Sequence, residues 1–268
     1  MDDHTVDEYT AILLCAGYGT RLGDLTATTP KPLLPVAGRP VLDYLLDQLW
    51  DLPRLRSVQV VSNAHYAGAF DAWAEERRVE AGRRGVELAV HDDGTVDNAS
   101  RLGAIGDLGF VLDRIGLPQG ALVAAGDNIF RFPLRPLWDR FLDRGEPTVL
   151  ALHEESTEKL RRTGVLVLDN DDRVTAFEEK PEVPPSPWAC PSVYGFDRAA
   201  LSRVGPYLAE GRPKDEIGRF VAHLVELGGV SARRVRGQRL HVGTVDELTA
   251  ADHLLRAEPV LRSTPDLP

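Results

Sequence analysis

Two glycines and two cationic side chains stand where they could bind phosphate. Gly17 and Gly19 follow a short apolar run, and Arg21 and Lys31 come soon after them. Glycine lets the backbone approach a ligand closely, and successive exposed N–H groups form a concave anion site. The spacing fits neither the phosphate loop that ends in Lys-Ser or Lys-Thr nor the three-glycine dinucleotide fingerprint. The pattern therefore indicates a phosphate site of another kind.

Charged residues recur at two later points in the chain. Asp127 follows the apolar run of residues 121–125, and an acidic residue at a strand end can hold Mg²⁺ against phosphate oxygens. Glu179 and Lys180 are adjacent. The carboxylate can accept hydrogen bonds from sugar hydroxyls while the ammonium meets a phosphate. Together these residues suit chemistry on a phosphorylated carbohydrate.

The segment of residues 13–49, LLCAGYGTRLGDLTATTPKPLLPVAGRPVLDYLLDQL, resembles the opening signature of the sugar-phosphate nucleotidyltransferases. The resemblance implies a phosphorus-group transferase that joins a nucleoside triphosphate to a sugar 1-phosphate and releases pyrophosphate. It implies that Arg21 grips the β- and γ-phosphates and that Lys31 reaches the phosphates around the reacting centre. The nucleotide would be wrapped by Ala16, Gly17, Gly19 and Thr20.

The resemblance continues to about residue 255 through the Gly-Asp-Asn and Glu-Glu-Lys-Pro motifs. It implies that Asp127 binds Mg²⁺, with Mn²⁺ as an alternative, and that Gly103 contacts the nucleotide. His91 and Asp92, at the end of a predicted strand, are candidate readers of the base. The implied catalytic residues are Arg21, Lys31, Asp127 and Lys180. The implied sugar-phosphate contacts are Asn128, Gly164, Glu179, Lys180 and Tyr194.

One position departs from the family pattern. Most relatives carry an aspartate near the C-terminus as the second metal ligand, but this chain has His241 there and Arg239 at the aromatic position. Mg²⁺ prefers oxygen ligands and needs only one or two carboxylates. We favour a metal held by Asp127 and substrate phosphates, and keep His241 as a second candidate ligand. Two alternatives are a transition metal on His241 and a protonated His241 that binds phosphate.

The elements that must position these residues follow from the hydrophobic pattern. In the first part of the chain, apolar runs alternate with amphipathic segments, which predicts strands joined by helices. The predicted strands are residues 11–14, 58–62, 86–90, 121–125 and 148–152, and the helices are residues 41–50, 67–81, 106–115 and 134–143. Beyond about residue 150, we expect strands at residues 164–168, 174–177, 192–196 and 230–235, and helices at residues 199–208 and 216–227.

This pattern predicts an α/β fold. We expect a Rossmann-like mixed, mostly parallel sheet flanked by helices, the nucleotide-diphospho-sugar transferase type that the resemblance implies. Residues 1–268 would form one domain, with a nucleotide half at about residues 9–150, a sugar-phosphate half at about residues 151–256 and a tail at residues 257–268.

Composition excludes several classes of protein. The apolar fraction of 43% indicates a folded protein, and 31 basic against 41 acidic residues give a net charge of −10, which disfavours nucleic acid and anionic membranes as partners. The two cysteines match no metal spacing. No signal peptide or apolar span is recognisable, so we expect a cytoplasmic protein. An anionic substrate therefore needs a local cationic cleft.

Three questions remain open at this level. The acceptor is a sugar 1-phosphate or, alternatively, a phosphorylated cyclitol or alcohol of the cytidylyltransferase type. A sugar-nucleotide-binding relative without activity is a further alternative because of His241. The base (dTTP, UTP, GTP or CTP) is not determined, and a homo-oligomer is compatible with the sequence.

Overall fold

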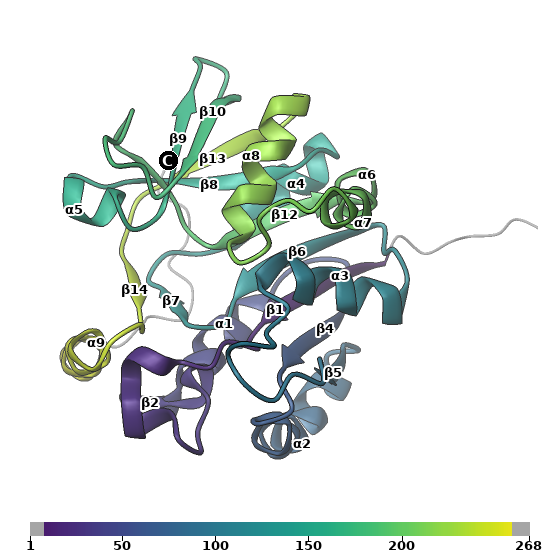
Figure 1. Ribbon diagram of the computed structural model, residues 1–268, viewed down its shortest axis with the longest axis vertical. Coiled ribbons are helices and arrows are strands. Elements are labelled where there is room, and N and C mark those ends of the chain that lie inside the picture. Colours follow the sequence, from purple (N-terminus) through teal and green to yellow (C-terminus); the bar gives the residue numbers. More distant parts are fainter. Residues whose placement is uncertain (1–7, 259–268) are drawn as a thin grey trace, which may run out of the picture.

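The computed structural model describes residues 8–258. A ten-stranded sheet runs through the molecule in the order β10-β9-β11-β8-β12-β6-β1-β4-β5, with β13 paired to β8 (Figure 1). The strands are β1 (Tyr9–Leu14), β4 (Leu55–Ser62), β5 (Glu87–Asp92), β6 (Gly120–Ala125), β8 (Thr148–His153), β9 (Gly164–Leu168), β10 (Val174–Glu179), β11 (Trp188–Cys190), β12 (Val193–Asp197) and β13 (Ser231–Val235).

Parallel pairing dominates the first part of the chain. β1 pairs in parallel with β4 and β6, and β4 pairs in parallel with β5. The pairings of β12, β11, β9 and β10 are antiparallel, while β13 runs parallel to β8. The α/β class and the mixed sheet are confirmed. Because β12 pairs directly with β6, both parts of the chain share one sheet.

Helices cover both faces, as the alternation of strand and helix requires. One apolar cluster packs α1 (Val41–Leu49), α2 (Ala67–Arg83) and α4 (Arg135–Arg144) on one face. A second cluster packs α3 (Ala104–Ile115), α6 (Arg198–Leu201), α7 (Val204–Ala209) and α8 (Ile217–Leu227) on the other (Figure 1). The two layers bury the Val, Leu and Ile runs on both sides of the sheet.

The helix predicted for residues 199–208 is wrong in one respect. The chain forms two short helices there, α6 and α7, separated at Ser202 and Arg203. Pro206 has no N–H to donate to the carbonyl of Ser202, so a continuous helix would lack that hydrogen bond.

Several small elements escaped the sequence pattern. They are β2 (Pro35–Val36), β3 (Arg39–Pro40), β7 (Asn128–Phe130), β14 (Arg239–His241), α5 (Thr157–Leu160), α9 (Val245–Ala257) and the 3₁₀ turns η1 (Thr20–Thr26) and η2 (Lys31–Leu33). α9 extends past residue 256 into the predicted tail, whose last residues, 259–268, lie outside the described part. Within residues 8–258, no helix is long and apolar enough to cross a membrane.

Candidate active site

The turn of residues 15–21, which contains Gly17 and Gly19 and is called the glycine turn below, meets the Gly-Asp-Asn motif of residues 126–128. They meet at the carboxyl ends of the parallel strands, called the carboxyl edge of the sheet below. β1 ends at Leu14, β6 ends at Ala125, and the N–H of Gly126 donates to the carbonyl of Leu14 over 3.2 Å. Lys31 begins η2 and points its ammonium at Asp127, with 2.6 Å between Nζ and Oδ2. In open α/β sheets ligands bind beyond this edge. Motifs far apart in the sequence therefore form one site.

Asp127 is held by cationic and polar donors. Its Oδ1 accepts a hydrogen bond from Nδ2 of Asn128 over 2.8 Å, and Nδ1 of His241 lies 3.8 Å from the same oxygen. Burial alone would raise the pKa of the carboxyl, but the nearby Lys31 and His241 hold that pKa below its usual value. Asp127 is therefore ionised, with the ammonium of Lys31 as its cationic partner.

His241 reaches this site through strand pairing. β14 pairs antiparallel with β7 and sets His241 opposite Asn128. Burial lowers the pKa of the imidazole despite the opposing effect of Asp127. A neutral imidazole therefore occupies the position beside the carboxylate.

The donor set fits a divalent cation only in part. Within residues 8–258, no three His, Cys, Asp or Glu side chains are arranged to hold a metal ion. Asp127 supplies one oxygen ligand, and the neutral ring of His241 lies beside it. Mg²⁺ commonly takes one or two carboxylates and completes its shell with water and substrate phosphates. The residues thus fit a cation that binds together with a phosphorylated substrate.

The second charged motif lies at the end of β10. Glu179 stands opposite Gly164 of β9, and burial raises the pKa of its carboxyl while Lys180 partly opposes the shift. Lys180 has a φ of 50°, a strained conformation for a residue with a side chain. Its backbone N–H donates to the carbonyl of Thr163 over 3.1 Å. Its ammonium lies 2.7 Å from Oε1 of Glu216.

Tyr194 lies beneath this part of the site rather than on its surface. It is buried in β12 and stacks on Phe196 with ring centroids 5.6 Å apart. Burial raises the pKa of its hydroxyl well above the ordinary value. Direct contact of Tyr194 with a sugar stays a prediction.

The predicted nucleotide residues are arranged around the glycine turn. Ala16 is buried and its carbonyl accepts a hydrogen bond from Nδ2 of Asn63 over 2.8 Å. Gly17 precedes Gly19, whose φ is 63° and which begins η1, and Thr20 and Arg21 are exposed. Arg21 has no hydrogen bond or ion pair with any residue in the described range 8–258. Its guanidinium is therefore free to meet a ligand.

The side chain of His91 contacts a residue of the neighbouring strand. Its Nε2 lies 2.7 Å from Oε1 of Gln59 in β4, and burial lowers the pKa of the ring. Asp92 is exposed and caps the N–H of Gly94 over 2.8 Å. The reading of a base by either residue stays a prediction.

Gly103 immediately precedes α3 and packs against the loop before α8. Its φ is 80°, and a Cβ at this position would lie 2.7 Å from the carbonyl oxygen of Lys214. Only glycine permits this close approach without strain. Gly103 therefore positions the amino end of α3 and the loop of residues 210–216 against one another.

The sequence pattern missed a pair of carboxyl groups beside this loop. The carboxyl of Asp107, in the first turn of α3, lies near that of Asp93. One buried oxygen of each group, Oδ1 of Asp107 and Oδ2 of Asp93, has no hydrogen-bond partner. Burial, followed by the charge of Asp93, raises the pKa of Asp107 to about 8. The signal in the sequence that could have indicated this pair is Asp107 itself, an acidic residue on the core-facing side of a predicted helix, one turn before Val111.

A second chain of contacts joins this pair to the glycine turn. The Asp93 carboxylate accepts from Oγ1 of Thr95 over 2.7 Å, and that hydroxyl lies 3.0 Å from Oη of Tyr18. Tyr18 stands between Gly17 and Gly19. The links therefore tie the loop after β5 to the phosphate-binding turn.

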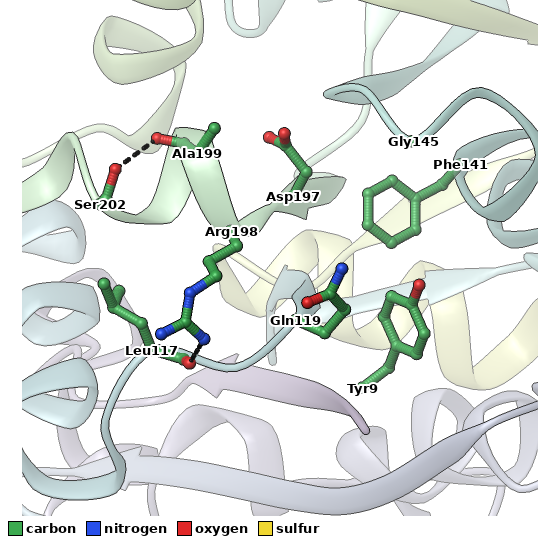
Figure 2. Close-up of a pocket in the computed structure, with 9 residues that line it drawn as sticks. All are labelled: Tyr9, Leu117, Gln119, Phe141, Gly145, Asp197, Arg198, Ala199 and Ser202. Atoms are coloured by element: carbon green, nitrogen blue, oxygen red, sulfur yellow. Dashed lines mark hydrogen bonds between the residues drawn. The ribbon is translucent and has the colours of Figure 1, made fainter. Parts of the chain in front are cut away.

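A cavity of about 480 Å³ lies at the opposite side of the sheet, where the parallel strands β1 and β6 begin (Figure 2). It is lined by Tyr9 at the start of β1, by Gln119 just before β6, and by Arg198, whose guanidinium donates to the carbonyl of Leu117. None of the predicted site residues lines it. The amino ends of parallel strands are not where such folds bind substrate, so this cavity is separate from the candidate active site.

The sequence is similar to known proteins over most of its length. A family model described as nucleotidyl transferase matches residues 10–258. The chain is 27% identical over 259 residues to the UTP–glucose-1-phosphate uridylyltransferase AglF of Haloferax volcanii, covering 92% of this chain and 97% of that protein. It is 31% identical over 196 residues to the mannose-1-phosphate guanylyltransferase catalytic subunit beta of Drosophila pseudoobscura pseudoobscura, covering 72% of this chain and 49% of that protein.

A solved structure shows the same architecture. It belongs to a Bacillus anthracis protein described as a glucose-1-phosphate thymidylyltransferase in complex with a sucrose. The TM-score is 0.73 at 25% sequence identity, and the match covers 92% of this chain and 95% of that one.

Proposed function

The chain belongs to the nucleotidyl transferase family and is a sugar-1-phosphate nucleotidyltransferase, and we propose that its reaction centre lies between Lys31, Asp127 and Lys180. The observation that carries this proposal is the 2.6 Å contact between Lys31 and Asp127, which joins two motifs at the carboxyl edge of the sheet. The Glu-Glu-Lys-Pro motif, through Lys180, supplies the cation for the second substrate.

The reaction forms one P–O bond and breaks another. A phosphate oxygen of the sugar 1-phosphate attacks the α-phosphorus of the nucleoside triphosphate, and the bond from that phosphorus to the oxygen bridging to the β-phosphorus breaks. The electron pair leaves with pyrophosphate. Since both substrates are anionic, positioning and charge neutralisation supply most of the catalysis.

Each cation has a proposed place along this path. Lys31 faces the α-phosphate, Arg21 holds the departing pyrophosphate, and Lys180 orients the attacking phosphate. The free guanidinium of Arg21 and the turn of Gly17 and Gly19 support this division. Asp127 would hold Mg²⁺ with phosphate oxygens, and that cation supplies additional positive charge when bound.

The acceptor side favours a sugar over a quaternary amine. Glu179 is a mostly buried carboxylate beside Lys180, which suits hydroxyl groups next to a phosphate. A choline-type headgroup would need an aromatic cage. A phosphorylated cyclitol shares the hydroxyl pattern of a sugar and remains the second candidate acceptor.

A substrate panel tests the proposal. Pyrophosphate release would be measured with dTTP, UTP, GTP and CTP, each paired with glucose 1-phosphate, mannose 1-phosphate and inositol 1-phosphate, with Mg²⁺ and Mn²⁺ compared. We expect turnover with at least one sugar 1-phosphate and its loss in Lys180→Ala and Arg21→Ala. Unchanged kcat/KM in both variants would overturn the residue assignments, and turnover confined to inositol 1-phosphate would overturn the sugar assignment.

A further inference from the structure

The loop before α8 joins the two sides of the active site. The carbonyl of Lys214 accepts a hydrogen bond from the N–H of Ile105 over 2.9 Å. The carboxylate of Asp215 accepts two hydrogen bonds from Arg101, at 3.2 and 3.0 Å. Both contacts fasten the loop to the amino end of α3, on the nucleotide side. The next residue, Glu216, turns to the sugar-phosphate side.

The carboxylate of Glu216 forms an ion pair with the ammonium of Lys180. Its Oε1 lies 2.7 Å from Nζ of Lys180, and its Oε2 lies 3.7 Å from Nε of Arg219 one turn along α8. The side chains of Lys180 and Glu216 are 47% and 35% exposed, so a ligand from solution can reach the pair. The carboxylate therefore lies where the phosphate of an incoming substrate would contact the ammonium of Lys180.

A phosphate and the carboxylate of Glu216 compete for the ammonium of Lys180. The ammonium has three N–H donors, but two anions held against it repel one another, so binding of one weakens binding of the other. Arg219 offers Glu216 a second cation on the same side of the loop. A change of side-chain rotamer is enough to move the carboxylate from one partner to the other.

The backbone around Glu216 is held in place during such a movement. Residues 214 and 215 are fastened to α3 as described. On the other side, Gly218 packs directly against the carboxylate of Glu179, leaving no room for a Cβ. Glu216 therefore changes partner without displacing the loop.

We propose that Glu216 is an internal stand-in for the sugar phosphate: it neutralises and holds Lys180 in the free protein, and moves to Arg219 when the phosphate binds. The inference rests on the proposed role of Lys180. Glu216 is accordingly a positioning residue that sets the affinity for the second substrate.

Steady-state kinetics of Glu216→Gln test this role, using the sugar 1-phosphate with the highest turnover in the panel. The amide cannot compete as an anion, so KM for the sugar 1-phosphate should fall about two- to five-fold, the range of a half-exposed ion pair. The KM for the triphosphate should stay the same. The matched control is Glu226→Gln near the far end of α8, where the side chain is 72% exposed; it should change neither constant.

A second set of variants removes Arg219, the alternative cationic partner of Glu216. In Arg219→Gln, Glu216 loses its other cation and stays on Lys180, so KM for the sugar 1-phosphate should rise. In the double variant Glu216→Gln/Arg219→Gln, the effect of the arginine should disappear, which a purely structural role of either residue would not produce. A higher KM in Glu216→Gln, or additive effects in the double variant, would overturn the proposal.

A binding measurement separates this inference from the proposed function. Inorganic phosphate titrated calorimetrically into the free protein should bind more tightly to Glu216→Gln than to the parent, whether or not turnover is found. Absence of turnover with every substrate pair contradicts the proposed function alone. Equal phosphate affinity in parent and variant contradicts the role of Glu216 alone.

Discussion

Nζ of Lys31 lies 2.6 Å from Oδ2 of Asp127, although 96 positions separate the two residues in the chain. The lysine starts a 3₁₀ turn after the glycine turn, and the aspartate follows the neighbouring parallel strand. The pair is mostly shielded from water, at 13% and 20% side-chain exposure. It keeps the carboxylate ionised and presents an ammonium at the edge where phosphates are expected.

Lys31→Met should remove this cation without removing the bulk of the side chain. We expect kcat/KM to fall by about 10²–10³, the usual cost of losing one group that stabilises a transition state. Lys159→Met is the control, because Lys159 is 69% exposed and pairs only loosely with Glu154 at 3.5 Å. Equal kcat/KM in the two variants would contradict the role of Lys31.

His241→Asp should strengthen metal binding. A carboxylate adds a negative charge and an oxygen donor beside Asp127, both of which Mg²⁺ prefers. We expect the Mg²⁺ concentration for half-maximal rate to fall on the order of ten-fold. His241→Asn adds no charge and should give no such gain; a requirement for Mg²⁺ that is the same in both variants argues against His241 as a neighbour of the metal.

The raised pKa of Asp107, buried near Asp93, predicts a pH-dependent stability. The pKa of Asp107 rises from 3.8 to about 8 in the folded protein, so between these values the folded state keeps a proton that the unfolded state releases. The contribution of this group to the free energy of unfolding is largest below about pH 4 and decreases up to about pH 8. Above that pH the contribution is constant.

Asp107→Asn should remove that dependence. The amide retains a donor toward Asp93 and cannot lose it as pH rises. We expect the Tm of the variant to exceed that of the parent by roughly 2–4 °C at pH 8.5, with a smaller difference at pH 5. Asp113→Asn, exposed on the same helix, should leave the pH profile of Tm unchanged; a profile of Asp107→Asn parallel to that of the parent would contradict the raised pKa of Asp107.

Gly126→Ala should disturb the junction between the glycine turn and Asp127. A Cβ at this position would overlap Sγ of Cys15, which is buried beneath it. Overpacking of this kind costs about 1–3 kcal/mol, and Asp127, the next residue, should shift with it. We expect lower Tm and lower activity together.

Cys15→Ala provides the rescue. The smaller side chain makes room for the new methyl group, so Gly126→Ala/Cys15→Ala should be more stable than the sum of the single changes predicts. Strict additivity of the two changes in Tm would show that the overlap is not the cause.

The local hydrophobic pattern was sufficient to predict the strands that position the site residues. The apolar runs at residues 11–14, 58–62 and 121–125 became β1, β4 and β6 with small changes at their ends, because buried parallel strands need continuous apolar sequence. Short elements such as β7 and β14 have too few residues to show a period. The pairing that sets His241 beside Asp127 therefore could not be read in advance.

The sequence by itself determined the family, the α/β class and the motifs that bear charge, because glycine turns, apolar runs and charged residues after strands are local properties of the chain. Tertiary structure alone decided which of these charges face one another. Lys31 contacts Asp127, Lys180 contacts Glu216, and Asp107 is buried near Asp93. Contacts of this kind depend on which strands lie side by side and how deeply each group is buried, and neither is a property of a short stretch of residues.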